Sequence, residues 1–138
     1  SKKIVSYARP VMPKLAKTAP SREWVKKSVA KGVTAQKAFR LKHKKTGLYL
    51  KMEKNGSLSL VKEFEESWKS LMWEQESAGG KYVRIRSVWK PKQYLHTETG
   101  DLKVGPIKQQ WHSAQWTRLK NQTKIYNRWK KRYLTIDF

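Results

Sequence analysis

The sequence predicts an all-β domain built from repeated units, and three observations support this fold class. Tryptophans recur at Trp24, Trp68 and Trp111, which lie 44 and 43 residues apart. A Tyr-Leu pair recurs in step at 49–50, 94–95 and 133–134. Short segments of alternating polarity are separated by turn signals about every 8–12 residues, a spacing typical of sandwiches and barrels. A fixed period of about 43 residues indicates copies of one supersecondary unit.

Residues 39–60 show the expected unit most clearly. Phe39-Arg40-Leu41 alternates in polarity, a basic break covers 42–47, and 48–52 is expected to form a second short strand. Asn55-Gly56 predicts a tight hairpin turn, because both residues readily adopt positive φ values. Leu58-Ser59-Leu60 then alternates again.

The later units repeat this order with weaker signals. Strands are expected at 83–85, 94–95, 102–104 and 133–136, with basic turns at 89–92 and 128–132. Residues 72–75 and 115–119 are expected to form hairpins with the strands that follow them. Two alternatives stay open: helices over 21–31 and 62–75, or a single helical turn near each recurring Trp.

The third unit stops midway, at residues 133–138. Residues 14–25 match residues 58–68, so the N-terminal segment is expected to complete the third unit, as in a circular permutation. This pairing would also remove an unpaired strand edge. The alternative is that residues 1–13 form a basic arm. In both cases residues 1–138 are expected to form one domain.

Three units of four short strands resemble the β-trefoil superfamily, with fascin-like and fibroblast-growth-factor-like domains as the most similar forms. The segments 39–58 and 83–104 carry the resemblance, which covers about residues 24–138. It implies a small three-fold barrel, here circularly permuted. It implies no particular activity, because trefoils serve many unrelated tasks.

Charge dominates the composition. Thirty-two Lys and Arg stand against ten Asp and Glu, which gives a net charge of +22, whereas solubility alone requires only about 2–8 in a small domain. A positive field of this strength attracts polyanions such as nucleic acid, sulfated glycan, anionic lipid or an acidic protein filament. The seven Trp and six Tyr supply the core area that a disordered tail lacks.

Catalytic and metal-binding patterns are missing from the sequence. The chain has no cysteine, and its three histidines show no metal-ligand spacing. No phosphate-cradling glycine loop or nucleophile elbow is present. The acidic cluster of Glu63, Glu65, Glu66, Glu74 and Glu76 is expected to be a solvated loop. We therefore expect a protein that is not an enzyme and has no cofactor, no metal site and no catalytic residue.

The three basic turns are the predicted binding site, because symmetry-related turns of a repeat emerge at one level of a barrel. Cations there would neutralise phosphates, and exposed indoles would stack on unpaired bases. The alternative is that each indole lies beneath aliphatic lysine stems. Trp68, Trp73, Trp111 and Trp116 are instead expected in the core. The predicted polyanion-binding residues are Lys42, Lys44, Lys45, Trp89, Lys90, Lys92, Arg128, Trp129, Lys130, Lys131 and Arg132, together with Lys2 and Lys3 of the basic N-terminal segment.

These observations predict a nucleic-acid-binding protein that contacts phosphates and prefers RNA to DNA, as part of a ribonucleoprotein or viral particle. One alternative is a secreted heparin- or heparan-sulfate-binding module like the growth factors, which would give meaning to the glycosylation triplets at Asn55 and Asn121. Another is a fascin-like module that binds actin filaments. No apolar run approaches the ~20 residues of a membrane span, and an intracellular location (cytoplasm or nucleus) is expected.

Overall fold

The computed structural model describes residues 11–19, 22–29 and 37–137. Within these ranges the chain forms β-strands and two 3-10 turns, and the strands join in one antiparallel sheet, so the expected all-β class is confirmed. The elements are β1 (Met12–Ala16), β2 (Trp24–Ser28), β3 (Phe39–His43), β4 (Tyr49–Met52), β5 (Leu58–Val61), η2 (Lys69–Leu71), β6 (Trp73–Gly79), β7 (Tyr82–Ser87), β8 (Tyr94–His96), β9 (Lys103–Gly105), η3 (His112–Ala114), β10 (Trp116–Thr117), β11 (Gln122–Thr123), β12 (Tyr126–Asn127) and β13 (Arg132–Asp137).

The central strands follow the order β2-β3-β6-β7-β10-β12. The sheet also curls back on itself, because β11 lies just before β12 in the chain and pairs with β2. Three outer strand pairs extend from this path, and two of them, β4–β5 and β8–β9, are hairpins. β4–β5 extends from β3, β8–β9 from β7, and β13–β1 from β12.

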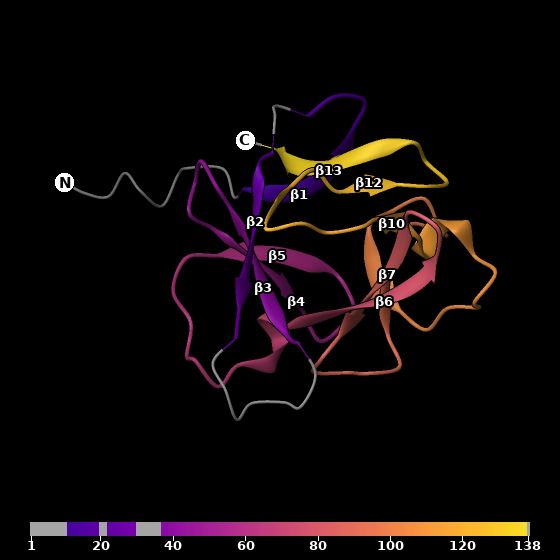
Figure 1. Ribbon diagram of the computed structural model, residues 1–138. Helices are drawn as coiled ribbons and strands as arrows, with labels where there is room; N and C mark the ends of the chain where they lie inside the picture. The colour runs from indigo at the N-terminus through magenta and orange to yellow at the C-terminus, as the bar shows by residue number, and fades with distance from the viewer. Residues whose placement is uncertain (1–10, 20–21, 30–36, 138) are drawn as a thin grey trace.

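The two ends of the described chain pair with each other. β1 runs antiparallel to β13 from Met12 opposite Asp137 to Ala16 opposite Tyr133, and Figure 1 shows β1 (indigo) beside β13 (yellow). The expected pairing of the N-terminal segment with the end of the chain is therefore observed. Met12 and Pro13 belong to β1 and not to an arm. Residues 1–10, with Lys2 and Lys3, lie outside the described residues.

Three buried tryptophans organise the core. Trp24, Trp73 and Trp116 are fully buried at the first positions of β2, β6 and β10. A buried indole N–H needs an acceptor, and each Nε1 donates to a leucine carbonyl of a recurring Tyr-Leu pair. The acceptors are Leu134 at 2.9 Å, Leu50 at 3.3 Å and Leu95 at 3.0 Å, respectively. The same link between a central strand and an outer hairpin therefore occurs three times.

The matching of tryptophans expected from the sequence is wrong by five residues in the second and third units. Trp24 corresponds to Trp73 and Trp116, which share its burial and its indole hydrogen bond. Trp68 and Trp111 instead precede the 3-10 turns η2 and η3. Trp68 is 41% exposed, so its expected core position is also wrong. Spacing misled here, because the segment that joins β1 to β2 is shorter than those that precede β6 and β10.

Candidate polyanion interface

Each of the three basic turns is capped by the side chain of the last residue in the preceding strand. His43, Ser87 and Asn127 end β3, β7 and β12. Each accepts a hydrogen bond from the backbone N–H three residues later: Thr46 to His43 Nδ1 at 3.3 Å, Lys90 to Ser87 Oγ at 3.0 Å and Lys130 to Asn127 Oδ1 at 2.8 Å. Three different residue types thus produce one turn design.

A second recurring contact fixes each turn against the start of a central strand. The backbone N–H of Lys44, Val88 and Arg128 donates to the carbonyl of Glu23 (2.8 Å), Met72 (3.0 Å) and Gln115 (2.9 Å). Each acceptor immediately precedes one of the three buried tryptophans. The three predicted turns therefore hold equivalent places relative to the core.

The second and third turns each line a concavity, and the first contacts a residue that lines another. Trp89 lines a groove with the β4–β5 hairpin, and Lys130 and Arg132 line a smaller one with Lys14 of β1. Lys44 donates from Nζ to Gln122 Oε1 at 3.0 Å. Gln122 lines a third concavity with the cations Arg22, Arg118, Lys120 and Lys124.

The cations of the turns are left without carboxylate partners. Among the described residues, no ion pair involves any of the nine predicted cations, which are Lys42, Lys44, Lys45, Lys90, Lys92, Arg128, Lys130, Lys131 and Arg132. Six of the ten acids pair with other cationic or histidine partners: Glu23, Glu53, Glu66, Glu74, Glu76 and Asp137. Within the described chain, the nine cations are therefore free of close ion pairs, although Asp101 lines the same concavity as Lys130 and Arg132.

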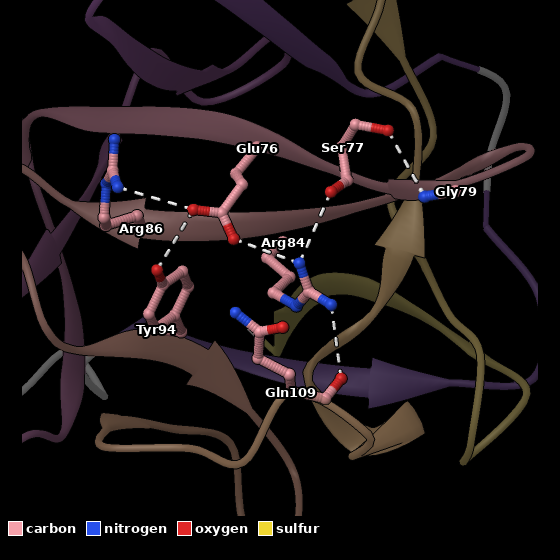
Figure 2. Close-up of polar contacts among 7 residues, drawn as sticks. All are labelled: Glu76, Ser77, Gly79, Arg84, Arg86, Tyr94 and Gln109. Carbon is pink, nitrogen blue, oxygen red and sulfur yellow. Dashed lines mark hydrogen bonds and ion pairs between the residues drawn. The ribbon is translucent and has the colours of Figure 1, made fainter.

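Part of the expected acidic loop lies instead in a strand, which corrects that expectation. Glu74 and Glu76 belong to β6 and face the arginines of β7. Glu76 bonds Arg84 at 3.0 Å and Arg86 at 3.4 Å, and also accepts from the Tyr94 hydroxyl at 3.2 Å, as Figure 2 shows. The hydrogen bond to Glu74 raises the pKa of Arg86 above its usual range.

Lysines lie over the indoles of two turns. Lys90 Nζ is 4.8 Å from the ring centroid of Trp89, and Lys130 Nζ is 4.9 Å from that of Trp129. Trp89 is partly buried and packs against the core, whereas Trp129 is 48% exposed. In both turns a lysine ammonium group therefore lies near the indole, and Trp129 keeps accessible surface.

Lys131 has an unusual backbone conformation. Its φ is 56°, and it is the one non-glycine residue with positive φ in the described chain. The equivalent position in the first turn is Gly47, with a φ of 76°, and both N–H groups donate to the strand-ending residue, Asn127 or His43. The third turn therefore carries a cation where backbone sterics favour glycine.

The groove beside Trp89 contains residues that the sequence analysis did not select. It is an open groove of roughly 760 Å³. Trp68 was missed because it was assigned to the core, although Glu65, Glu66, Ser67 and Lys69 around it already indicated a solvated segment. The lining residues are Lys51, Glu53, Lys54, Asn55, Ser57, Trp68, Lys69, Ser70 and Trp89.

Two further structural findings concern only the described ranges. They contain no group of three or more His, Asp or Glu residues placed to hold a metal ion. None of their helical segments has the length and apolar character needed to cross a membrane.

Comparison with known proteins shows similarity to solved structures. No family model and no curated protein sequence matches this chain. Among solved structures, it is similar to a GlcNAcα1-4Gal-releasing endo-β-galactosidase from Clostridium perfringens, with a TM-score of 0.56 and 26% sequence identity. The match covers 70% of this chain but only 24% of that protein, so the chain corresponds to about a quarter of the enzyme.

Proposed function

We propose that this chain is a circularly permuted β-trefoil that binds nucleic acid without catalysis, RNA in preference to DNA. The fold is supported by three contacts that each recur three times: the indole–carbonyl bond, the capped turn, and the bond that fixes each turn to a central strand. The pairing of β1 with β13 supports the permutation, since these strands from opposite ends of the described chain form the third outer strand pair.

One observation carries the binding proposal: nine cations lie in three equivalent turns or, as Lys42 and Arg132 do, in the flanking strand ends, and none forms an ion pair within the described chain. Lys and Arg side chains that neutralise phosphates release condensed counterions, which supplies sequence-independent affinity. The exposed indole of Trp129 adds a stacking face for an unpaired base. Unpaired bases are far commoner in RNA, which favours RNA, and a ribonucleoprotein or viral particle is the expected setting.

The groove supports a non-catalytic role. Hydrolysis of a glycosidic bond normally uses two carboxyl groups, one of which has a raised pKa. Glu53 is the single carboxylate among the described groove residues. The hydrogen bond from Ser59, followed by the contact with Lys51, lowers the pKa of Glu53 despite the opposing effect of burial. A lowered pKa is the reverse of what a general acid requires.

Charge reversal in one turn tests the proposal. The variant K130E/K131E/R132E should bind a labelled single-stranded RNA at least tenfold more weakly than the unmodified protein. The matched control K81E/K103E/K108E changes the net charge equally, at exposed lysines outside the turns, and should lose clearly less affinity. Equal losses of RNA affinity in the two variants would show that binding depends on net charge alone.

A sulfated glycan is the second candidate, because the similar solved structure is an enzyme that acts on a glycan. Sulfates would contact the same cations, in the manner of heparan-sulfate-binding growth factors. Heparin that displaces RNA only at large excess would favour RNA, and glycan found on Asn55 or Asn121 of the native protein would favour the secreted alternative. Co-sedimentation with actin at physiological salt tests the fascin-like alternative.

A further inference from the structure

We propose that the groove lined by Trp68 binds an unpaired base of a single-stranded nucleic acid, stacked on the Trp68 indole, with adjacent phosphates on Lys54 and Lys69. This inference rests on the proposed function and adds a site outside the three basic turns. The groove lies between the β4–β5 hairpin and the β7–β8 turn, and η2 forms part of its wall.

The exposure of Trp68 is not imposed by its backbone. Trp68 and Trp111 hold the same position before a 3-10 turn, with φ of −69° in both and ψ of 110° and 111°. Both backbone N–H groups donate to the carbonyl three residues earlier, at 3.0 Å. The Trp111 ring nevertheless packs against His96, with centroids 5.7 Å apart, whereas Trp68 is 41% exposed. The exposed indole also lines a groove with a second tryptophan, Trp89, and this combination favours a binding role.

Two contacts restrict Trp68 before any ligand binds. Its backbone is fixed to Glu65, and Lys51 Nζ lies 5.9 Å from its ring centroid. Lys51 is itself bound to both carboxylate oxygens of Glu53, at 3.0 Å each. A preorganised aromatic ring loses little conformational entropy on binding, so more of the stacking energy appears as affinity.

The hydrogen-bonding groups of the groove select an anion over a neutral sugar. The acceptors already have internal partners: Glu53 accepts from Lys51 and from Ser59 Oγ, and Asn55 Oδ1 accepts from the Ser57 N–H and Oγ at 3.0 and 2.7 Å. Lys54 and Lys69 are exposed and form no ion pair within the described chain. Sugar hydroxyls need acceptors as well as donors. Open ammonium groups beside an indole suit phosphates and a base.

The groove is continuous with one of the predicted turns. Lys90 of the β7–β8 turn donates from Nζ to the Lys54 carbonyl at 3.2 Å, and Trp89 of the same turn lines the groove. A strand bound in the groove can therefore extend its phosphates toward Lys90 and Lys92. A base in the groove and phosphates on the turn would be contacts of a single ligand.

Substitution of Trp68 tests the inference with labelled 12-nucleotide oligouridine, a 12-base-pair RNA duplex and a heparin oligosaccharide as probes. W68A should bind the single strand about tenfold more weakly, since one lost base–aromatic stack has an effect of that order. Its affinities for the duplex and for heparin should stay within about twofold. W68F should recover most of the single-strand affinity. W111A is the matched control and should bind the single strand normally.

Several outcomes would overturn the inference. If W68A binds oligouridine normally while K130E/K131E/R132E does not, the groove is not the base site and the proposed function stands. If W68A loses heparin and not oligouridine, the occupant is a sulfated glycan. If the unmodified chain binds neither oligouridine nor the RNA duplex, the proposed function and the base site both fail. The thermal midpoint of W68A should match that of the unmodified chain, because the substituted side chain is exposed, and recovery by W68F separates a lost stack from misfolding.

Discussion

At the scale of single residues, a buried polar side chain shapes each basic turn, and Asn127 shows this most fully. Asn127 is fully buried, and its Oδ1 accepts from the N–H groups of Trp129 (3.1 Å) and Lys130 (2.8 Å). Its Nδ2 donates to the Ser113 carbonyl at 2.9 Å. Because a neutral side chain shapes the turn, the cations around it can serve a ligand.

Lys131 should show a conflict between stability and binding. A left-handed backbone costs an L-residue about 1 kcal/mol relative to glycine. K131G should therefore raise the free energy of unfolding, by about 1 kcal/mol or less, and weaken RNA binding. Chemical denaturation and RNA titration measure the two effects.

The control for this prediction is K45G, which removes an exposed lysine from the first turn, where φ is not positive. It should weaken binding without any gain in stability. A K131G variant that is less stable than the unmodified chain would show that Lys131 has a structural role.

His96 should make stability depend on pH. Burial lowers its pKa below the ordinary value of 6.5, and Lys103 adds to this while Glu98 opposes it. The unfolded chain therefore binds more protons near that pH, so the free energy of unfolding should fall as pH drops through about 6.5. In H96N, the amide oxygen can still accept the Glu98 N–H that bonds His96 Nδ1 at 3.0 Å. Denaturation between pH 7 and 5 should give a smaller slope for H96N, and equal slopes would contradict this cause.

At the scale of elements, an indole–carbonyl hydrogen bond joins each of the strands β2, β6 and β10 to an outer strand pair. Trp73 of β6 donates to Leu50 of β4 in this way. W73F removes that donor and shrinks a fully buried side chain, so it should destabilise the chain by about 2–4 kcal/mol. W129F changes an exposed ring and should have little effect. Thermal unfolding of the two variants measures the difference, and similar midpoints would contradict the assigned role of Trp73.

The β1–β13 pairing gives a second test at this scale. A chain without residues 1–16 lacks β1 and leaves an edge of β13 unpaired. Exposed strand edges promote association, so this chain should unfold at lower temperature and form oligomers in light scattering. A chain without residues 1–10 keeps β1 and is the control. Identical behaviour of the two chains would mean that the pairing contributes little to stability.

Local patterns in the sequence predicted most of the elements but not every side-chain environment. Alternation and turn signals located the strands from Phe39 to Leu60, because they depend on neighbouring residues only. The environments of Trp68 and Trp111 could not be separated, since both have the same backbone and differ in what packs against them. The positions of Glu74 and Glu76 depended on β7, which supplies their arginine partners across the hairpin.

The sequence predicted the basic turns of the candidate site but not the groove beside them. The basic turns are contiguous in the sequence, so their cations could be listed without a structure. The groove brings together Lys51, Trp68 and Trp89 from three separate segments. No local pattern marks such a combination, and the misplaced Trp68 hid the residue that defines it.

At the scale of the whole molecule, the carboxylates are placed so that they do not neutralise the basic turns. The chain carries a net charge of +22. Its described ion pairs join Glu66, Glu74 and Glu76 to arginines outside the turns, and Glu23 to His43 at the base of the first turn. Like charges on one small domain repel each other and destabilise it. A polyanion that binds the turns would relieve this repulsion, so bound RNA should also raise the thermal midpoint.

The most direct test of polyanion binding is the affinity for single-stranded RNA measured across a series of salt concentrations. Each neutralised phosphate adds about −0.7 to the slope of log affinity against log salt. Contacts by at least six of the nine turn cations predict a slope of about −4 or steeper. A slope near zero, or no binding at low salt, would contradict the account.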